Sequence, residues 1–241
     1  MTVSNVGSRV GFSGPYPAGG STPPTSPKFY EGIMKELIEK LKGIKSHIDG
    51  KTIITYMKDN NWKNWKQMEY AGFWFEEYVR QTLNLPEGNR YGKCMFDCLY
   101  NGIDVDCKFH SILKKDGTKN KDTLGNSLSA CRESIKKNGY FYLIVANAYA
   151  EYDYDNTFAQ WVKSLYTQRT NKRHNYSFSR MRKKAFNIKN IVLYKITEEV
   201  LNNNKSFQEG FTNSNGKRRN AKVAFSENNL PEPEIIIELN T

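Results

Sequence analysis

The sequence contains little of what a membrane protein, a secreted disulfide-bonded domain or a zinc protein requires. No run of apolar residues is long enough to cross a bilayer and no secretory signal is visible, so we expect a cytoplasmic protein without a membrane partner. The three histidines are scattered, and the four cysteines lack the spacing of a disulfide framework. We therefore expect no zinc site and reduced cysteines in or near the core. These cysteines are Cys94, Cys98, Cys107 and Cys131.

Acidic residues are scarce relative to basic ones. The 241 residues carry a formal net charge of +11, and the isoelectric point is near 9.3. Between Asp155 and Glu198 no acidic residue occurs, although Lys and Arg are frequent there. A solvated surface normally mixes both signs, so this imbalance predicts contact with a polyanion. Because no segment can cross a membrane, double-stranded DNA is the favoured partner.

The N-terminal segment lacks the residues that could form a core. Residues 1–25 are rich in Gly, Ser, Pro and Thr, which predicts a disordered arm, either native or left from expression. The rest of the chain has the size of one domain, and its hydrophobic content of 38% is ordinary for a globular protein. We predict a single domain over 26–241, with a core at about 62–197 and a C-terminal accessory segment at 198–241.

The most informative stretch is residues 92–111, which is predicted to be a β-hairpin. Asn101-Gly102 favours a type I′ turn, because that turn needs positive φ at both central residues. The turn fixes the register of the two strands. Counting outward gives the predicted pairs Tyr100–Ile103, Leu99–Asp104, Cys98–Val105 and Asp97–Asp106.

One face of this hairpin is charged. Side chains alternate along a strand, so Asp104, Asp106 and Lys108 are expected to project on the same side as Asp97. Opposed carboxylates lie about 4.5–5.5 Å apart at Cβ and repel each other unless a positive charge lies between them. Two such acids hold Mg²⁺, which lowers the pKa of a bound water, while a lysine positions that water or offsets developing charge. The pattern predicts metal-assisted phosphodiester hydrolysis by Asp97, Asp106 and Lys108, although a solvated or salt-bridged surface hairpin is the alternative.

Asp97 together with Asp106-Cys107-Lys108 resembles the motif of the PD-(D/E)XK nuclease superfamily, which includes most type II restriction endonucleases. Phe96 stands where the family's name places a proline, and the second acid is Asp rather than the commoner Glu. The resemblance implies Mg²⁺ as the cofactor, held by Asp97 and Asp106. It also implies an α/β (α+β) fold with a central mixed β-sheet flanked by helices, an αβββαβ core and, here, basic accessory segments.

The resemblance further implies an acid on the helix before the hairpin. In this family such a glutamate often adds a metal ligand or orients a metal-bound water. Glu76, in the segment 72–76, is the match, and we expect it to be a third catalytic residue and metal ligand. Glu69 lies two turns earlier on nearly the same face and Glu77 is rotated by about 100°, so both remain alternatives.

Hydrophobic periodicity and end signals predict the other elements. An amphipathic helix begins at Ser26-Pro27 and ends near Asp49-Gly50, and residues 52–61 are ambiguous. After the hairpin, a polar basic loop turns at Asp116-Gly117. The remaining predicted elements are helices at 62–83, 127–137, 156–165 and 198–203, and strands at 140–148, 188–197 and 235–237.

Two basic regions are candidates for contact with nucleic acid. The first lies within 169–184, where aromatic residues alternate with cations, and its end at 179–184 is the favoured DNA clamp. The second is a turn at 213–219 between two candidate strands, although surface turns are often basic for solubility alone. The predicted DNA-binding residues are Arg169, Lys172, Arg173, Arg180, Arg182, Lys183, Lys184, Lys217, Arg218 and Arg219.

These observations favour a Mg²⁺-dependent, sequence-specific type II restriction endonuclease of a restriction–modification system. A palindromic target cut on both strands would further favour a homodimer. A Holliday-junction or repair nuclease of the same fold is the first alternative. The second is a non-catalytic basic nucleic-acid-binding module in which Asp97, Asp106 and Lys108 form only a salt-bridged hairpin.

Overall fold

The computed structural model describes residues 40–166, 181–210, 212, 216, 218 and 220–239. The predicted N-terminal arm, most of the helix predicted from Ser26, and Ser179 and Arg180 of the predicted DNA clamp lie outside these residues. No helix in the described ranges is both long and apolar enough to cross a membrane.

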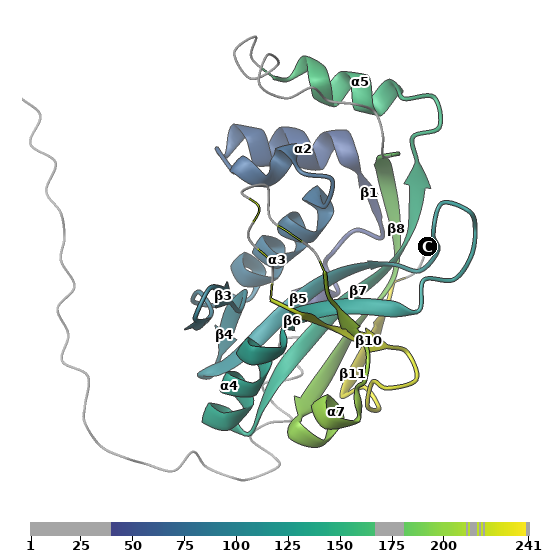
Figure 1. Cartoon of the computed structure of the whole chain (residues 1–241). Helices are drawn as coiled ribbons and strands as arrows, with labels where there is room; N and C mark the ends of the chain where they lie inside the picture. The colour runs from purple at the N-terminus through teal and green to yellow at the C-terminus, as the bar shows by residue number, and fades with distance from the viewer. Residues whose placement is uncertain are drawn as a thin grey trace, which may run out of the picture.

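A mixed β-sheet forms the centre of the protein (Figure 1). Its parallel pair is formed by β5 and β7, and its other strand pairs are antiparallel. Strand β11 lies along the edge of β8 that also carries β1, because the opposite edge of β8 is paired with β7 throughout. The sheet order is β1 (His47–Asp49), β8 (Lys183–Thr197), β7 (Tyr140–Tyr152), β5 (Ile103–Ser111) and β4 (Cys98–Tyr100), with β11 (Ile235–Glu238) beside β8.

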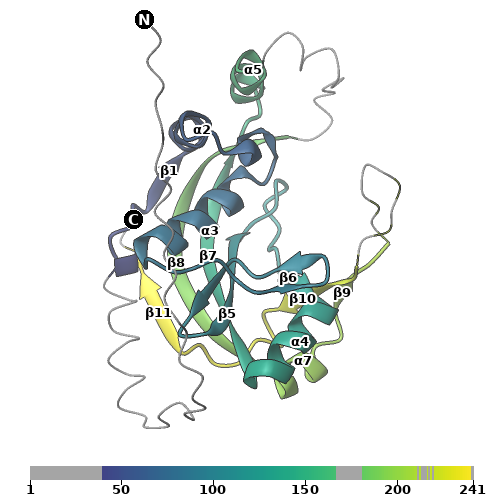
Figure 2. The same cartoon turned by 90° about the vertical axis from the view of Figure 1, so that its left-hand side faces the viewer.

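Helices cover both faces of this sheet. Helices α2 (Gly50–Asp59) and α3 (Tyr70–Thr82) pack on one face, where Phe75 belongs to the same buried cluster as Cys107. Helix α4 (Leu128–Asn138) packs on the other face, where Cys131 and Leu143 are buried together. In Figure 2, α3 lies across one side of the sheet, and α4 and α7 lie together on the other. The predicted α/β class with a helix-flanked mixed sheet is confirmed, and the two further described α-helices are α5 (Thr157–Ser164) and α7 (Glu198–Asn203).

A second, three-stranded sheet was not predicted. It consists of β6 (Asp122–Ser127), β10 (Lys222–Ser226) and β9 (Phe207–Gln208). Strands β6 and β10 pack closely at Gly125, since a Cβ on this residue would come within 2.7 Å of the Phe225 ring. This sheet flanks the hairpin side of the molecule, where β2 (Arg90–Tyr91) and β3 (Cys94–Met95) form a small ladder of their own.

Local signals explain the limits of α4 and the start of β7, which agree with the prediction, whereas β7 runs on to Tyr152, beyond the predicted end at Ala148. The Ser127 side chain caps α4 by accepting a hydrogen bond from the backbone N–H of Ala130 at 3.3 Å. Gly139 ends the helix with φ of 80°, a conformation that favours glycine. Strand β7 then follows directly and is buried along most of its length, as a strand between two neighbours should be.

Two predicted helices differ from the structure. The prediction that the first helix ends near residues 49–50 is wrong, because His47–Asp49 forms strand β1. Asp49 instead caps the start of α2 by accepting a hydrogen bond from the Thr52 N–H. The helix expected over 62–83 is divided into a 3₁₀ turn, η1 (Lys63–Lys66), and α3. The C-terminal segment is also more than an accessory, since β11 extends the central sheet.

Candidate active site

The hairpin has the predicted turn and register. Asn101 and Gly102 have φ of 50° and 81°, and three of the predicted cross-strand pairs occur, Cys98–Val105, Leu99–Asp104 and Tyr100–Ile103. The fourth pair is replaced by a different contact. The Asp97 carboxylate lies beside β5 and accepts a hydrogen bond from the backbone N–H of Cys107 at 2.6 Å. This bond holds Asp97 next to the segment that carries Asp106.

The ammonium group of Lys108 lies among oxygen atoms of the predicted motif. Its Nζ is 2.6 Å from Asp106 Oδ1, 2.8 Å from the carbonyl oxygen of Cys107 and 3.6 Å from Asp97 Oδ2. Asp106 is only 1% exposed, so this contact is shielded from solvent. A cation is thus held where two carboxylates and a carbonyl meet at the end of the hairpin.

The donor set fits a divalent cation. Asp106 Oδ2 is buried and has no hydrogen-bond partner among the described residues, so one carboxylate oxygen remains available to a ligand. Carboxylate and carbonyl oxygens are the ligands that Mg²⁺ prefers. In the part of the chain that the structure describes, no three acidic, His or Cys side chains already converge as a preformed metal cluster. A divalent cation would therefore have to compete with the Lys108 ammonium for these oxygens.

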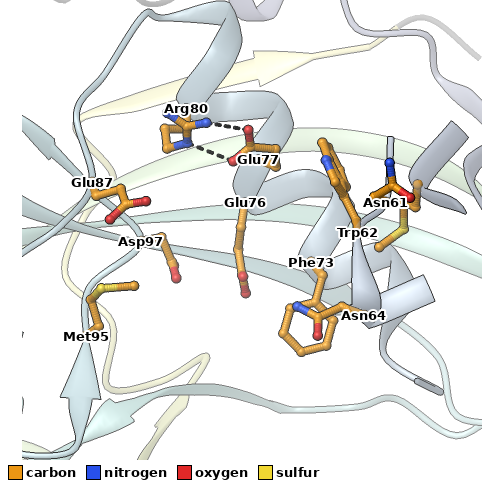
Figure 3. A pocket seen from close by; sticks show the side chains of 11 residues that line it. Asn61, Trp62, Asn64, Phe73, Glu76, Glu77, Arg80, Glu87, Met95 and Asp97 are labelled. Carbon is orange, nitrogen blue, oxygen red and sulfur yellow. Dashed lines mark hydrogen bonds and ion pairs between the residues drawn. The ribbon is translucent and has the colours of Figure 1, made fainter. Parts of the chain in front are cut away.

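Glu76 extends from α3 toward the same place. Figure 3 shows Glu76 and Asp97 pointing into one cleft from different elements. Burial, and next the negative charge of Asp97, raise the pKa of Glu76 to about 8. Burial also raises the pKa of Asp97 to about 6, although the Lys108 charge opposes that shift. Burial alone would lower the pKa of Lys108, but the charges of Asp106 and Asp97 raise it well above its usual range.

The structure favours Glu76 over the two alternative acids. Glu77 accepts hydrogen bonds from the guanidinium of Arg80, one of them at 2.7 Å from Nε, and this pairing lowers the pKa of Glu77. Glu69 is exposed at the start of α3, where its charge acts on Lys183 rather than on the acids of the hairpin.

Asp104 belongs to a separate, structural cluster. It is 0% exposed and accepts hydrogen bonds from the Tyr91 hydroxyl at 2.8 Å, the Ser134 hydroxyl at 2.7 Å and the Asn89 backbone N–H at 3.3 Å. Burial and the bond to Asp104 raise the pKa of Tyr91 to about 12. Asp104 therefore links the hairpin to α4 and has a structural role.

The cleft beside these acids has a volume of about 590 Å³. One cation that the sequence pattern missed acts on it from the small sheet. Lys222, exposed on β10, lies close enough for its positive charge to lower the pKa of Glu76. The only sequence signal for this residue was its position shortly after the basic turn at 213–219.

The predicted DNA-binding cations differ in how far their side chains are exposed to solvent. Arg182 is only 8% exposed and its Nη2 donates to the carbonyl oxygen of Lys66 at 3.4 Å, so the expectation that it contacts DNA does not fit its burial. Lys183 donates to the Ser111 hydroxyl at 2.5 Å, and burial lowers its pKa. Lys184 is half-buried and Arg218 is exposed. The residues outside the described ranges are Arg169, Lys172, Arg173, Arg180, Lys217 and Arg219.

Comparison with known proteins gives no relative. No family model matches the chain, and neither a curated protein nor a solved structure matches it. A functional assignment therefore depends on the residues and on their geometry.

All four cysteines are free thiols. Cys98 and Cys107 are fully buried beside the candidate acids, and a hydrogen bond with Cys98, together with burial, raises the pKa of the Cys107 thiol. A thiol with a raised pKa is a poor nucleophile and a poor metal ligand. Cys107 is therefore poorly suited to act as a nucleophile or metal ligand, and both thiols pack in the main hydrophobic core.

Proposed function

We propose that this protein is a Mg²⁺-dependent endonuclease that hydrolyses phosphodiester bonds of double-stranded DNA. The observation that supports it most directly is the position of the Lys108 ammonium between Asp106, the Cys107 carbonyl and Asp97, with Asp106 Oδ2 left without a partner among the described residues. These oxygen atoms already bind one cation, the Lys108 ammonium, and Asp106 Oδ2 is still available as a ligand, so the arrangement suits a divalent metal. The order of helix α3, the β4–β5 hairpin, helix α4 and parallel strand β7 agrees with the core that the PD-(D/E)XK resemblance implies.

The roles follow from the contacts. Asp97, Asp106 and Glu76 would hold Mg²⁺, which supplies the charge that polarises a phosphate and activates water. The Cys107 N–H orients Asp97, and burial of Asp106 keeps its carboxylate fixed. Lys108, once separated from Asp106, offers a positive charge to the attacking water or to the phosphate oxygens.

The restriction enzyme is the more specific form of this proposal. A chain of this size, with a net charge of +11 and basic segments outside its core, suits an independent DNA-cutting enzyme in the cytoplasm. Cleavage of a palindromic site on both strands would favour a two-fold symmetric homodimer.

Incubation of supercoiled plasmid with the purified protein tests the proposal. We expect cleavage with Mg²⁺ and none with EDTA, and we expect Asp106→Asn to abolish it because a carboxamide is a weaker ligand for a hard cation. Glu133→Gln is the matched control, since Glu133 is an exposed acid on the outer side of α4 and should retain full activity. Cleavage that survives EDTA, or that survives in Asp106→Asn, would exclude this mechanism.

The same gel separates the rival functions. Discrete fragments from a plasmid of mixed sequence indicate a restriction enzyme. Nicking that depends on a cruciform or a flap indicates a junction or repair nuclease. Binding without cleavage, unchanged by Mg²⁺ or EDTA, indicates a non-catalytic DNA-binding module.

A further inference from the structure

The cleft beside the catalytic acids has a second wall that the proposed chemistry does not use. Glu76 and Asp97 project into the cleft, and the wall on the right of Figure 3 carries two aromatic rings and two side-chain amides. A volume of about 590 Å³ greatly exceeds the needs of a hydrated ion, since one water takes about 30 Å³. The four residues of this wall are Asn61, Trp62, Asn64 and Phe73.

The fold holds the two rings in place. The Trp62 backbone N–H donates to the Met57 carbonyl at 2.8 Å, and the Trp62 ring meets Tyr56 edge to face with centroids 5.5 Å apart. Phe73 lies in the first turn of α3. Both rings rest partly on the main hydrophobic core and are only half-buried, so part of each ring remains open to the cleft. A ligand would meet preformed apolar surfaces, and little ordering would be needed to bind it.

The acidic side chains that line the cleft disfavour the binding of an anion in it. Its described lining contains the carboxylates of Glu76, Glu77, Glu87 and Asp97, and its one cation, Arg80, is paired with Glu77. When ionised, as a bound divalent cation would keep Glu76, carboxyl groups accept hydrogen bonds and do not donate them. The cleft therefore suits a flat, uncharged group that stacks on aromatic rings and donates hydrogen bonds at its edge. Among the parts of DNA, a nucleobase with an amino group has this chemistry.

We propose that this cleft receives an unstacked nucleobase carrying an exocyclic amino group, adenine, cytosine or guanine, beside the phosphate that is cut. The inference rests on the proposed endonuclease function, because it places the base next to Glu76 and Asp97. Enzymes that take a base out of a duplex read it by stacking and by hydrogen bonds to its edge. The Asn61 and Asn64 amides offer both donors and acceptors for that edge.

Labelled DNA duplexes with one unpaired nucleotide test this site. The unpaired position is A, C, G, T or an abasic residue, and Kd is measured by fluorescence anisotropy with Ca²⁺ in place of Mg²⁺. We expect A, C and G to bind about tenfold more tightly than the abasic residue, because they stack on the rings. We expect a similar preference over T, because T offers no amino group to the acceptors of the cleft. Phe73→Ala and Asn64→Ala should each reduce that preference. Trp74→Leu, at the neighbouring position of α3 but lining a different groove, should leave it intact.

The outcomes separate the base site from the nuclease activity. Equal affinities for the five duplexes, or a preference that both Phe73→Ala and Asn64→Ala retain, would overturn the base site. If wild-type protein then still cuts plasmid with Mg²⁺, the endonuclease proposal stands without it. If the preference is present and depends on Phe73 while no plasmid cleavage occurs, the base site is supported and the endonuclease proposal fails. Circular dichroism of each variant establishes that a lost preference does not reflect unfolding.

Discussion

Lys108 has two opposing effects on the candidate site. Its ammonium contacts Asp106 and the Cys107 carbonyl, so it occupies space that a divalent cation needs, yet the chemistry needs a positive charge near the phosphate. We predict that Lys108→Met lowers the cleavage rate at least a hundredfold and also strengthens Mn²⁺ binding without DNA. Calorimetric titration with Mn²⁺ and single-turnover cleavage measure the two effects. Lys137→Met, an exposed substitution on α4, should change neither, and loss of both properties in Lys108→Met would contradict the prediction.

Asp104 looks similar to Asp106 in the sequence but has a structural role. Replacing it with Ala leaves three donors without their acceptor, among them the buried Ser134 hydroxyl. We predict a loss of about 3 kcal/mol in the free energy of unfolding, measured by urea denaturation. Asp122→Ala, an exposed acid on β6, should cost less than about 0.5 kcal/mol. An unchanged urea midpoint for Asp104→Ala would show that its hydrogen bonds contribute little.

The raised pKa of Glu76 predicts how stability depends on pH without metal. Its folded pKa of about 8 exceeds the ordinary 4.5, so between these values the folded protein binds more protons than the unfolded chain. Stability must therefore fall as pH rises through this window. We expect the melting temperature in EDTA to fall from pH 5 to pH 8 and to fall less steeply in Glu76→Gln. Mg²⁺ should restore stability at pH 8 in the wild type, whereas parallel pH profiles for the two proteins would refute this assignment.

Among the elements, strand β10 places a cation near the Glu76 side of the candidate cleft from a distant part of the sequence. Lys222 lies on this strand and its charge lowers the pKa of Glu76. We predict that Lys222→Ala weakens DNA binding and reduces the slope of log affinity against log salt by about 0.9, the effect of one lost phosphate contact. Anisotropy titrations at several salt concentrations measure the slope. Lys136→Ala, exposed on α4, is the control, and an unchanged slope in Lys222→Ala would remove β10 from the DNA-binding surface.

Elements with strong local signals could be predicted from the sequence. The hairpin register follows from Asn101-Gly102, and the limits of α4 follow from its Ser127 cap and Gly139. Strand β6 was missed because its inward-facing residues are small or polar, Thr123 and Ser127 among them, and give no apolar alternation. The helix predicted to end near residue 50 failed because the buried Ile48 is on a strand, and an apolar spacing does not by itself specify the backbone.

At the scale of the whole molecule, the candidate site was more predictable than the DNA-binding surface. Asp106 and Lys108 lie together by alternation along β5, Asp97 joins them through the hydrogen bond from the Cys107 N–H, and Glu76 joins them through the packing of α3 on β5. Arg182 shows that the density of cations in the sequence does not predict which of them are exposed. A dense run of cations predicts exposure, yet the fold buries this guanidinium against the Lys66 carbonyl, a contact 116 residues apart that no local pattern contains.

The oligomeric state determines how the proposed enzyme would cut both strands of a duplex. Among the described residues, one candidate hairpin per chain supplies one set of Asp97, Asp106 and Lys108, and two such sets related by a two-fold axis would match the two antiparallel strands. We predict that the protein with its DNA site sediments as twice the 27.9 kDa chain plus one duplex. Plasmid should then pass from supercoiled to linear form with little open-circle intermediate.

Mixed dimers test this prediction directly. When wild-type protein is mixed with an excess of Asp106→Asn, most active dimers carry one functional hairpin and can cut only one strand. Open-circle plasmid should accumulate in proportion to the mixed dimers, since both subunits still bind DNA. A monomeric enzyme would behave differently, because inactive chains would only compete for sites and would slow cleavage without changing the ratio of nicked to linear product. An unchanged product ratio across the titration would therefore exclude a dimer in which each subunit cuts one strand.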